Sequence, residues 1–223
     1  MNLDEFTPEQ IKQGLLGTIF ADGCISKKKG RYKNAYLEIT HTSKNLDYLK
    51  FKQALLKRIG INSTISEHNK KTETKNYSLF RLYAYANEWF TELQQTIYSD
   101  KRVKLFPRNY IDSFNLLSLV LLYLDDGTLK MRYYEGTDKI REMRVTFCLD
   151  SFILPELLYF RDWLYKTYNI ETKYYRHTKS QDINRGFRLW TNTANTKRFM
   201  QLLKDFYNIV PSMNYKFIYY YLS

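Results

Sequence analysis

Two aspartates, Asp22 and Asp126, end similar apolar segments and are the residues of this chain best placed to do chemistry. Each precedes a glycine, and the two acids lie 104 positions apart (126 − 22), close to half of the 223 residues. The apolar segments are shorter than the ~20 residues that a membrane span needs, so they indicate buried helices. Gly23 and Gly127 then predict helix ends, because glycine adopts the left-handed cap conformation without a side-chain clash.

The position of these acids is electrostatically unfavourable. A carboxylate in the last turn of a helix faces the negative end of the helix dipole, which costs about 0.3–1 kcal/mol. One such acid is best explained as a solvated carboxylate before a turn, because short motifs are weak evidence. Two acids at matching places favour a positive group at the helix ends, and a divalent cation is the obvious candidate.

Residues 15–23 and 119–127 resemble the LAGLIDADG motif of homing endonucleases, in the single-chain form that carries two motifs. The likeness is strongest over the last three residues of each segment, Ala-Asp-Gly in the first and Asp-Asp-Gly in the second. Leu121 departs from it, since the family often has a small residue there. Phe20 and Leu124 replace the first acid of the motif, which is not the catalytic one, so the implied chemistry is retained.

This resemblance implies a metal-dependent endonuclease that cuts both strands of DNA and uses Mg²⁺ or another divalent cation such as Mn²⁺. Asp22 and Asp126 would be its catalytic acids and metal ligands. The backbone carbonyls of Ala21 and Asp125 would also bind metal. Hard cations held by carboxylates can activate water and stabilise charge on a phosphate that is being cut.

Two lysines extend the resemblance. Lys104 and Lys216, one after each repeat, resemble basic residues that lie near the active site in this family and order water or stabilise charge there. They are therefore candidate catalytic residues. Solvated surface lysines are an equally good explanation in so basic a chain, because charge runs are usually exposed.

The charge of the chain points to a polyanionic partner. Lys and Arg outnumber Asp and Glu by 35 to 23, which gives a formal net charge of +12. Without a long apolar run, a signal-peptide pattern or an amphipathic tail to indicate a membrane, we expect double-stranded DNA as the partner. The abundance of Lys, Asn, Ile, Tyr and Phe is a weak hint of an AT-rich genome, such as that of an organelle or a phage.

Cysteine and histidine do not indicate a metal cluster. Cys24 and Cys148 lack the C-x-x-C spacing of a zinc site and do not suggest a disulfide scaffold. The histidines His41, His68 and His177 are scattered, and we expect all three to be ordinary surface residues.

Periodicity predicts the same order of elements twice. In the first half we expect a helix that begins at Thr7 and Pro8, a hairpin (27–33 and 36–40), a helix (45–59), two strands (61–67 and 77–85) and a helix (87–98). In the second half we expect the motif helix, a hairpin (130–134 and 144–149), a helix (154–168), a second hairpin (170–176 and 187–191) and a helix (194–207), followed by a tyrosine-rich tail.

This pattern is an internal duplication with a period of about 107 residues. It predicts an α+β fold of two pseudo-symmetric α-β-β-α-β-β-α repeats that form a DNA-binding saddle of antiparallel sheets. We assign residues 1–98 to the first repeat, 99–112 to a linker and 113–223 to the second repeat. The order matches the repeat unit of the family, and a single chain with both repeats is expected to act as a monomer.

Small residues mark one face of the first motif helix. Gly14, Gly17, Thr18 and Ala21 recur at helical spacing, which lets a second helix approach closely. We expect the two motif helices to pack on each other, with Leu121 filling the space that Gly17 leaves.

DNA recognition is expected from the outward residues of the eight strands, because a β-ribbon can enter the major groove and read base edges. Any one contact is likelier to be made to phosphate than to a base. The candidates are Lys28, Arg31, Tyr36, Glu38, Arg81, Tyr83, Arg132, Arg144, Lys173, Tyr175, Arg185 and Arg188.

Two other classes of function stay open. A protein that keeps the fold without cleavage, either an intron-RNA maturase or a DNA-binding module, would share the basic surface, and intron RNA would then be a partner. A basic structural nucleic-acid protein also fits the charge but leaves the duplicated helix ends unexplained. Retention of both Asp22 and Asp126 favours the endonuclease, because acids oppose the binding of a polyanion.

Overall fold

The computed structural model describes residues 5–27, 33–71, 76–177 and 182–221. Its first half comprises α1 (Pro8–Phe20), β1 (Cys24–Ser26), β2 (Ala35–Thr42), α2 (Leu46–Arg58), β3 (Ser63–Lys71), β4 (Asn76–Asn87) and α3 (Glu88–Ile97). The second half comprises α5 (Leu116–Asp126), β5 (Gly127–Tyr133), β6 (Ile140–Phe147), α6 (Leu154–Tyr168), β7 (Lys173–Arg176), β8 (Phe187–Trp190) and α7 (Thr193–Leu202). Between the halves lies α4 (Arg108–Asp112), and short 3-10 helices are η2 (Ser43–Asn45), η3 (Lys204–Phe206) and η4 (Pro211–Tyr221).

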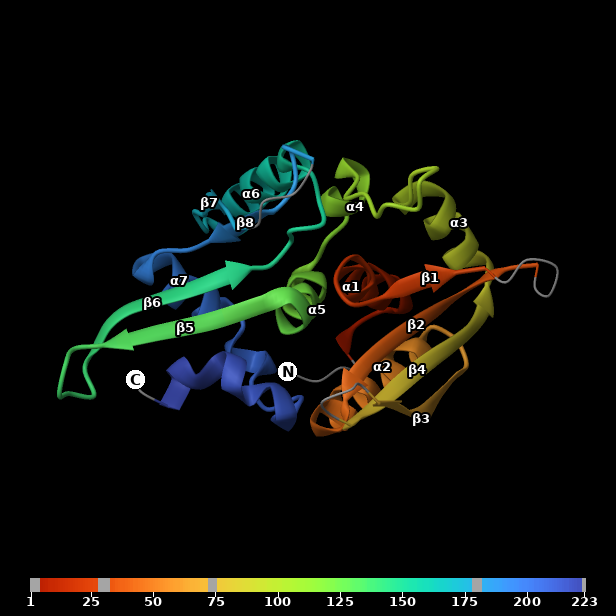
Figure 1. Cartoon of the computed structure of the whole chain (residues 1–223), viewed down its shortest axis with the longest axis horizontal. Coiled ribbons are helices and arrows are strands. Elements are labelled where there is room, and N and C mark those ends of the chain that lie inside the picture. Colours follow the sequence, from red (N-terminus) through yellow and green to blue (C-terminus); the bar gives the residue numbers. More distant parts are fainter. Residues whose placement is uncertain (1–4, 28–32, 72–75, 178–181, 222–223) are drawn as a thin grey trace.

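The two halves contain equivalent antiparallel sheets. The strand orders are β1-β2-β4-β3 and β5-β6-β8-β7, so each strand of the first sheet has a counterpart in the second. Figure 1 shows one sheet on each side of the adjacent helices α1 and α5. The predicted α+β class and its repeated α-β-β-α-β-β-α units are confirmed.

Several element boundaries differ from the prediction. The first hairpin uses β1, which ends at Ser26, before the lysine-rich run that we expected to form this strand, and residues 28–32 lie outside the described residues. The predicted closing helix stops at Leu202 and continues only as η3, while the linker and the tyrosine-rich tail contain α4 and η4. The last two strands are shorter than expected, since β7 begins at Lys173 and β8 ends at Trp190.

The start of α1 follows from its sequence. Thr7 and Gln10 form a capping box: the Gln10 amide donates to the Thr7 hydroxyl at 3.2 Å, and the Thr7 amide donates to the Gln10 side chain at 2.9 Å. Pro8 occupies the first turn, where its missing N–H costs nothing. None of the helices in the described part of the chain is long and apolar enough to cross a membrane.

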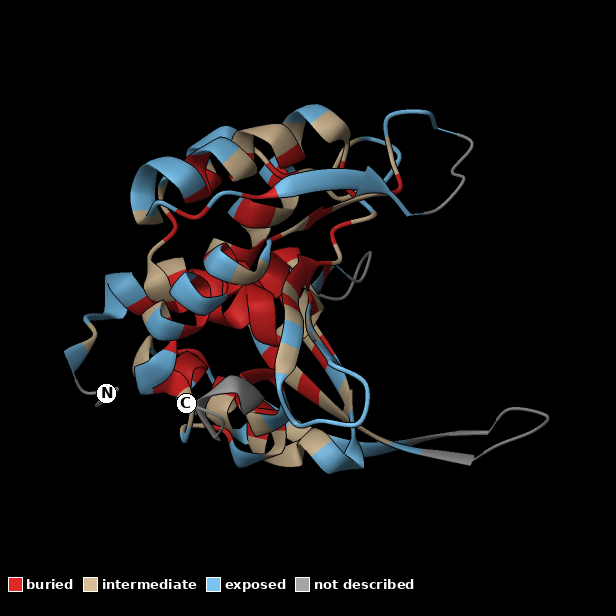
Figure 2. Cartoon of the chain, turned by 90° about the vertical axis from the view of Figure 1, so that its left-hand side faces the viewer, coloured by how far each residue is buried: buried red, intermediate tan, exposed pale blue. Residues whose placement is uncertain are grey.

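Helices α1 and α5 pack through their backbones, as the small-residue face predicted. A Cβ atom at Gly17 would lie 2.0 Å from the carbonyl oxygen of Ser118. The expectation that Leu121 fills this space is wrong, because the backbone of α5 from Ser118 to Leu122 occupies it. Figure 2 shows the buried residues concentrated at the centre of the molecule, and Leu117 to Leu124 are all buried.

The glycines after the motif acids do not adopt the left-handed conformation that we expected. Gly127 has φ −92° and ψ 154° and is the first residue of β5, and Gly23 also lacks a positive φ. Close packing explains these glycines instead. A Cβ at Gly127 would lie 2.1 Å from the ring of Tyr123, and one at Gly23 would lie 2.8 Å from the Cα of Ile19.

Candidate active site

The motif acids lie where the two packed helices end. Asp22 follows the last turn of α1, and Asp126 is the last residue of α5. The side chain of Asp22 is 37% exposed. Gly17, five residues before Asp22, packs against the backbone of Leu122, four residues before Asp126, so both acids lie at a similar level. The charge of Asp22 raises the pKa of Asp126.

Both acids are held in an environment that penalises their charge. Burial raises the pKa of Asp126 to about 7, and the carboxylates of Asp22 and Asp125 add to this effect. Burial and the Asp125 carboxylate likewise raise the pKa of Asp22, against the opposing influence of nearby lysines. Clustered carboxylate oxygens that ionise reluctantly are a suitable donor set for a hard divalent cation, which would neutralise them.

Lys104 and Lys216 bind the carbonyl oxygens at the C-terminal ends of α1 and α5 in the same way. The Lys104 ammonium donates to the carbonyl oxygens of Ile19 at 2.8 Å, Ala21 at 3.0 Å and Gly23 at 2.8 Å. The Lys216 ammonium donates to those of Leu124 at 2.6 Å and Gly127 at 2.8 Å, and lies 3.4 Å from the carbonyl oxygen of Asp125.

These contacts make the lysines counter-charges for the helix dipoles as well as neighbours of the acids. The ammonium groups therefore contact the carbonyls of Ala21 and Asp125 that the family resemblance assigns to metal. Burial lowers the pKa of both lysines, and the nearby aspartates oppose this shift.

The side chain of Asp125 belongs to a buried polar group that adjoins Asp22. It is fully buried and pairs with the equally buried Lys52 at 2.7 Å. The Thr18 hydroxyl donates to its other oxygen. Only the backbone carbonyl of Asp125 was predicted to bind metal, and its carboxylate is held by these partners.

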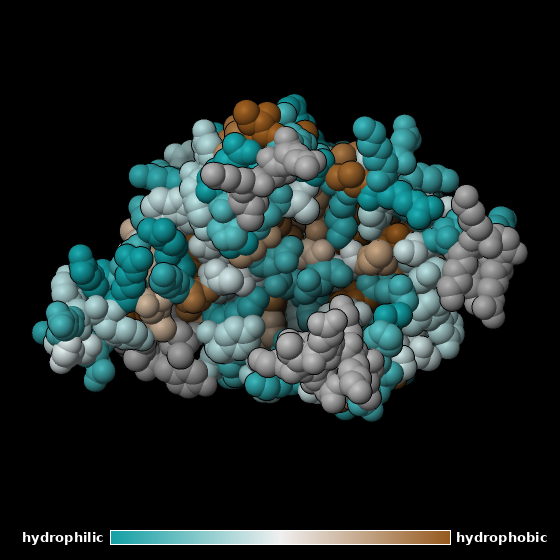
Figure 3. All heavy atoms as spheres, in the orientation of Figure 1, coloured by the Kyte–Doolittle hydropathy of each residue, from teal (hydrophilic) through white to brown (hydrophobic). Residues whose placement is uncertain are grey.

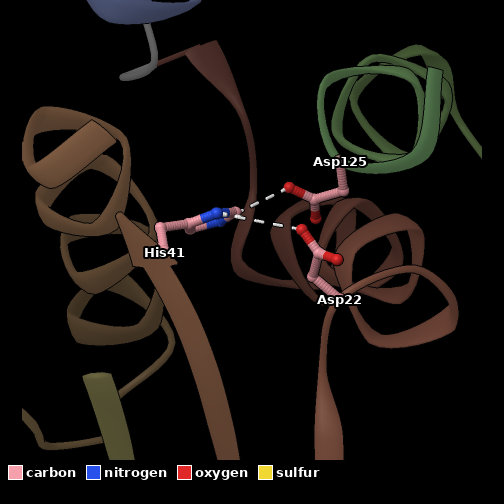
Figure 4. A group of neighbouring side chains, drawn as sticks. All are labelled: Asp22, His41 and Asp125. Carbon is pink, nitrogen blue, oxygen red and sulfur yellow. Dashed lines mark ion pairs between the residues drawn. The ribbon is translucent and has the colours of Figure 1, made fainter. Parts of the chain in front are cut away.

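His41 is a site residue that sequence reasoning missed. The prediction that it lies at the surface is wrong, since its side chain is only 9% exposed and lies between Asp22 and Asp125 (Figure 4). One nitrogen or oxygen atom from each of these three residues lies within 4.8 Å of the others. Burial and the Lys52 ammonium lower the pKa of His41 to about 4, against the opposing effect of Asp125.

A signal for this group was present in the sequence. The alternation of Leu37 and Ile39 continues to His41, which places the histidine on the inward face of β2. Lys52 lies three residues after Leu49 and three before Leu55, on the buried face of α2. Each polar residue interrupts an apolar face, which indicates a buried polar partner.

The first sheet presents its predicted contact residues on one face. Glu38 and Arg81 form an ion pair at 3.2 Å. The rings of Tyr36 and Tyr83 lie 4.9 Å apart, and Tyr36 is only 6% exposed, so Tyr83 covers much of it. The candidates Lys28 and Arg31 lie outside the described residues.

The second sheet presents a basic face with an aromatic centre. The Arg144 guanidinium lies 4.0 Å from the centroid of Trp190, and the Lys173 ammonium lies 5.9 Å from it. Arg144 and Arg132 both pair with Glu142, at 2.7 and 3.3 Å.

The remaining candidates lie towards the β7–β8 end. Arg188 pairs with Asp150 at 2.7 Å, and Tyr175 is 37% exposed. Arg185 lies in the loop between β7 and β8 rather than on a strand, where it pairs with Asp182. In the view of Figure 3 the surface is largely hydrophilic.

The fold and the paired acids define a two-repeat protein whose motif helices meet between two equivalent sheets, each helix carrying an acid at its end. The chain belongs to the LAGLIDADG DNA endonuclease family, whose family model matches residues 12–216.

Solved structures of a homing endonuclease and a meganuclease share this fold. The homing endonuclease I-WcaI bound to its DNA recognition sequence superposes with a TM-score of 0.75 at 17% identity, over 96% of this chain and 88% of that one. The LAGLIDADG meganuclease I-AabMI bound to uncleaved DNA gives a TM-score of 0.50 at 10% identity, over 90% of this chain and 84% of that one.

Curated relatives in sequence carry the name RecA. The protein from Mycobacterium shimoidei is 25% identical over 94% of this chain and 47% of its own length, and that from Mycolicibacterium flavescens is 23% identical over the same shares. The chain thus spans about half the length of these relatives.

Proposed function

We propose that this protein is a monomeric site-specific endonuclease that makes a double-strand break in DNA by metal-dependent phosphodiester hydrolysis. The observation that carries the proposal is the meeting of Asp22 and Asp126 at the ends of two packed helices, one acid from each half. A pseudo-twofold pair of acids suits a duplex, because its two strands run in opposite directions.

The acids and the lysines of the site would have different roles in this reaction. Asp22 and Asp126 would hold Mg²⁺ or Mn²⁺, with the carbonyls of Ala21 and Asp125 as further ligands. Bound there, the cation supplies an activated water and charge stabilisation on the phosphate. Lys104 and Lys216, fixed beside the acids by the helix-end carbonyls, would add positive charge close to the scissile groups.

The outward faces of the two sheets would bind the DNA. Their described candidates come from both halves, so a duplex lying across them would pass over the helix ends that carry the acids. The ion pair of Arg188 with Asp150, at 2.7 Å, orients this guanidinium group before DNA arrives. Fixed donors lose less conformational entropy on binding than free ones.

The test first obtains a target and then separates binding from cleavage. Duplexes that the purified protein retains would be selected from a randomised library in Ca²⁺, and then incubated with the protein in Mg²⁺. We expect cleavage of both strands in Mg²⁺, and its loss in Asp22→Asn and Asp126→Asn with binding retained. Binding without cleavage in every divalent metal would contradict the proposal and indicate a binding module, and selective retention of structured RNA would indicate a maturase.

A further inference from the structure

A buried polar group beside Asp22 links the two halves of the chain. Lys52 on α2 donates to both carboxylate oxygens of Asp125, at 2.7 and 3.0 Å, and lies 3.0 Å from Nε2 of His41. The Lys52 ammonium also lies 4.0 Å from the ring centroid of Tyr48. The group therefore has two fully buried charges that neutralise each other, and a histidine ring held at its edge.

The contact with Lys52 determines which nitrogen of His41 carries the proton. An ammonium group has donors and no acceptor, so Nε2 must accept its hydrogen bond with a lone pair. A neutral imidazole has one N–H, which must then be on Nδ1. This Nδ1 faces Asp22, at 3.8 Å from Oδ2 (Figure 4). At that distance the N–H is directed at the carboxylate but lies beyond hydrogen-bonding range, and a small rotation of either side chain would bring it within range.

The other half has no such group at the corresponding positions. The pairing of Cys24 with Glu38 corresponds to that of Thr128 with Thr146, each beginning two residues after a motif acid. Three residues further along the chain, His41 on β2 corresponds to Leu149, which lies just after the end of β6 and is fully buried.

In the helices and the motifs, too, a polar residue of this group corresponds to an apolar residue in the other half. Lys52 is the seventh residue of α2, and the seventh residue of α6 is the buried Phe160. Asp125, which precedes the second motif acid, corresponds to Ala21. The polar residues His41, Lys52 and Asp125 thus correspond in position to the apolar residues Leu149, Phe160 and Ala21.

We propose that His41 is a positioning residue for Asp22 alone, held by the Lys52–Asp125 ion pair with its Nδ1–H directed at that carboxylate, so that the two acids occupy unequal sites. This inference deepens the proposed endonuclease function and rests on it. Its consequence is that cleavage of one DNA strand depends on His41 and cleavage of the other does not. Asp126, with Leu149 at the equivalent position, has no such histidine among the described residues.

The tautomer can be measured without any activity. Long-range ¹H–¹⁵N correlation spectra of the metal-free protein should show His41 protonated on Nδ1 only, and Lys52→Met should abolish that preference. A His41 ring protonated on Nε2, or on both nitrogens at pH 7.5, would overturn the inference. Because this readout needs no cleavage, it still tests His41 if the wild-type protein cuts neither strand, an outcome that would defeat the proposed function instead.

Cleavage of a supercoiled plasmid with separately labelled strands tests the consequence. His41→Leu should slow cutting of one strand by about 10-fold or more, the loss expected for a hydrogen bond to a charged group, and nicked circles should accumulate. His41→Asn should restore most of the rate, because its amide nitrogen lies near the position of Nδ1. Equal slowing of both strands, or no slowing, would overturn the inference.

A triple substitution provides the matched control for folding. His41→Leu, Lys52→Phe and Asp125→Ala together copy the apolar set of the other half, so the core has a precedent for them. We expect this variant to melt as a folded protein and to cut the two DNA strands at a ratio of rates different from that of wild type, because both acids then have apolar neighbours. A folded triple variant that keeps the wild-type ratio of the two strand-cutting rates would show that the polar group does not make the sites unequal.

Discussion

Lys104 and Lys216 occupy equivalent places in the two halves, each with its ammonium group within hydrogen-bonding distance of several carbonyl oxygens at the end of a motif helix. Each comes from the segment that follows its repeat, so the linker and the C-terminal segment play matching structural roles. The two ammonium groups thus supply part of the positive charge that we expected beside the acids at the helix ends.

Removing either lysine charge should destabilise the fold. Lys104→Met and Lys216→Met leave helix-end carbonyls unsatisfied in a buried place, and each should lower the free energy of unfolding by about 1–3 kcal/mol. Urea denaturation measures this loss. Lys101→Met is the matched control, because Lys101 is exposed in the same linker and should have almost no effect. Unchanged stability of Lys104→Met would mean that its contacts contribute little in solution.

Enlarging Gly17 should disrupt the helix pair more than enlarging Gly14. A Cβ at Gly17 meets the backbone of Ser118 at 2.0 Å, whereas one at Gly14 meets the flexible side chain of Leu117 at 2.5 Å. We therefore expect Gly17→Leu to abolish soluble folding, and Gly14→Ala to be rescued partly by Leu117→Ala. Soluble yield and thermal melting measure both effects, and a normal melting curve for Gly17→Leu would refute the close contact.

The raised pKa of Asp126 makes stability depend on pH in a defined direction. Its pKa is about 7 in the folded protein against an ordinary value of 3.8. The folded state therefore binds the proton more tightly, and this residue's contribution to the free energy of unfolding falls as pH rises from about 4 to about 7. Asp126→Asn should melt at a higher temperature than wild type at pH 8 without divalent metal, and the difference should shrink towards pH 4. A lower melting temperature of Asp126→Asn at pH 8 would contradict this account.

Divalent metal should stabilise the folded protein by neutralising the charges of Asp22 and Asp126. Mg²⁺ or Mn²⁺ should raise the melting temperature of the wild-type protein at pH 8, because a ligand that binds only the folded state stabilises it, and EDTA should reverse the shift. Asp22→Asn and Asp126→Asn should each reduce the shift. Asp162→Asn is the matched control, as this exposed acid on α6 lies outside the acid pair, and its shift should equal that of wild type.

Binding of DNA to the basic face of the second sheet should release counterions from the DNA and make the affinity depend on salt. If Lys173 contacts a phosphate, Lys173→Met should reduce the slope of log K against log salt by about one unit. Lys166→Met on α6 should leave the slope unchanged, since this exposed lysine is not on a strand. Binding titrations at several salt concentrations measure the slopes, and equal slopes for the two variants would exclude Lys173 as a phosphate contact.

The sequence by itself determined the repeat, the element order and the small-residue contact. These features are local or periodic: alternation in residues 36–40, the capping box at Thr7 and the small-residue face around Gly17 depend on neighbours along the chain. The likeness of the two motifs was enough to select Asp22 and Asp126. The division of residues into repeats at 98 and 113 stays a prediction.

Only the tertiary structure decided the surroundings of the acids. His41, Lys52 and Asp125 come from β2, α2 and α5, so their contact depends on how the second motif helix packs beside the first half of the chain. The roles of Gly23 and Gly127 also required it, because the nearest atoms that exclude a side chain there belong to the last turns of the preceding helix, and their distance depends on how the chain leaves that helix. Electrostatic energies vary with distance and burial, which the spacing of residues along a chain does not specify.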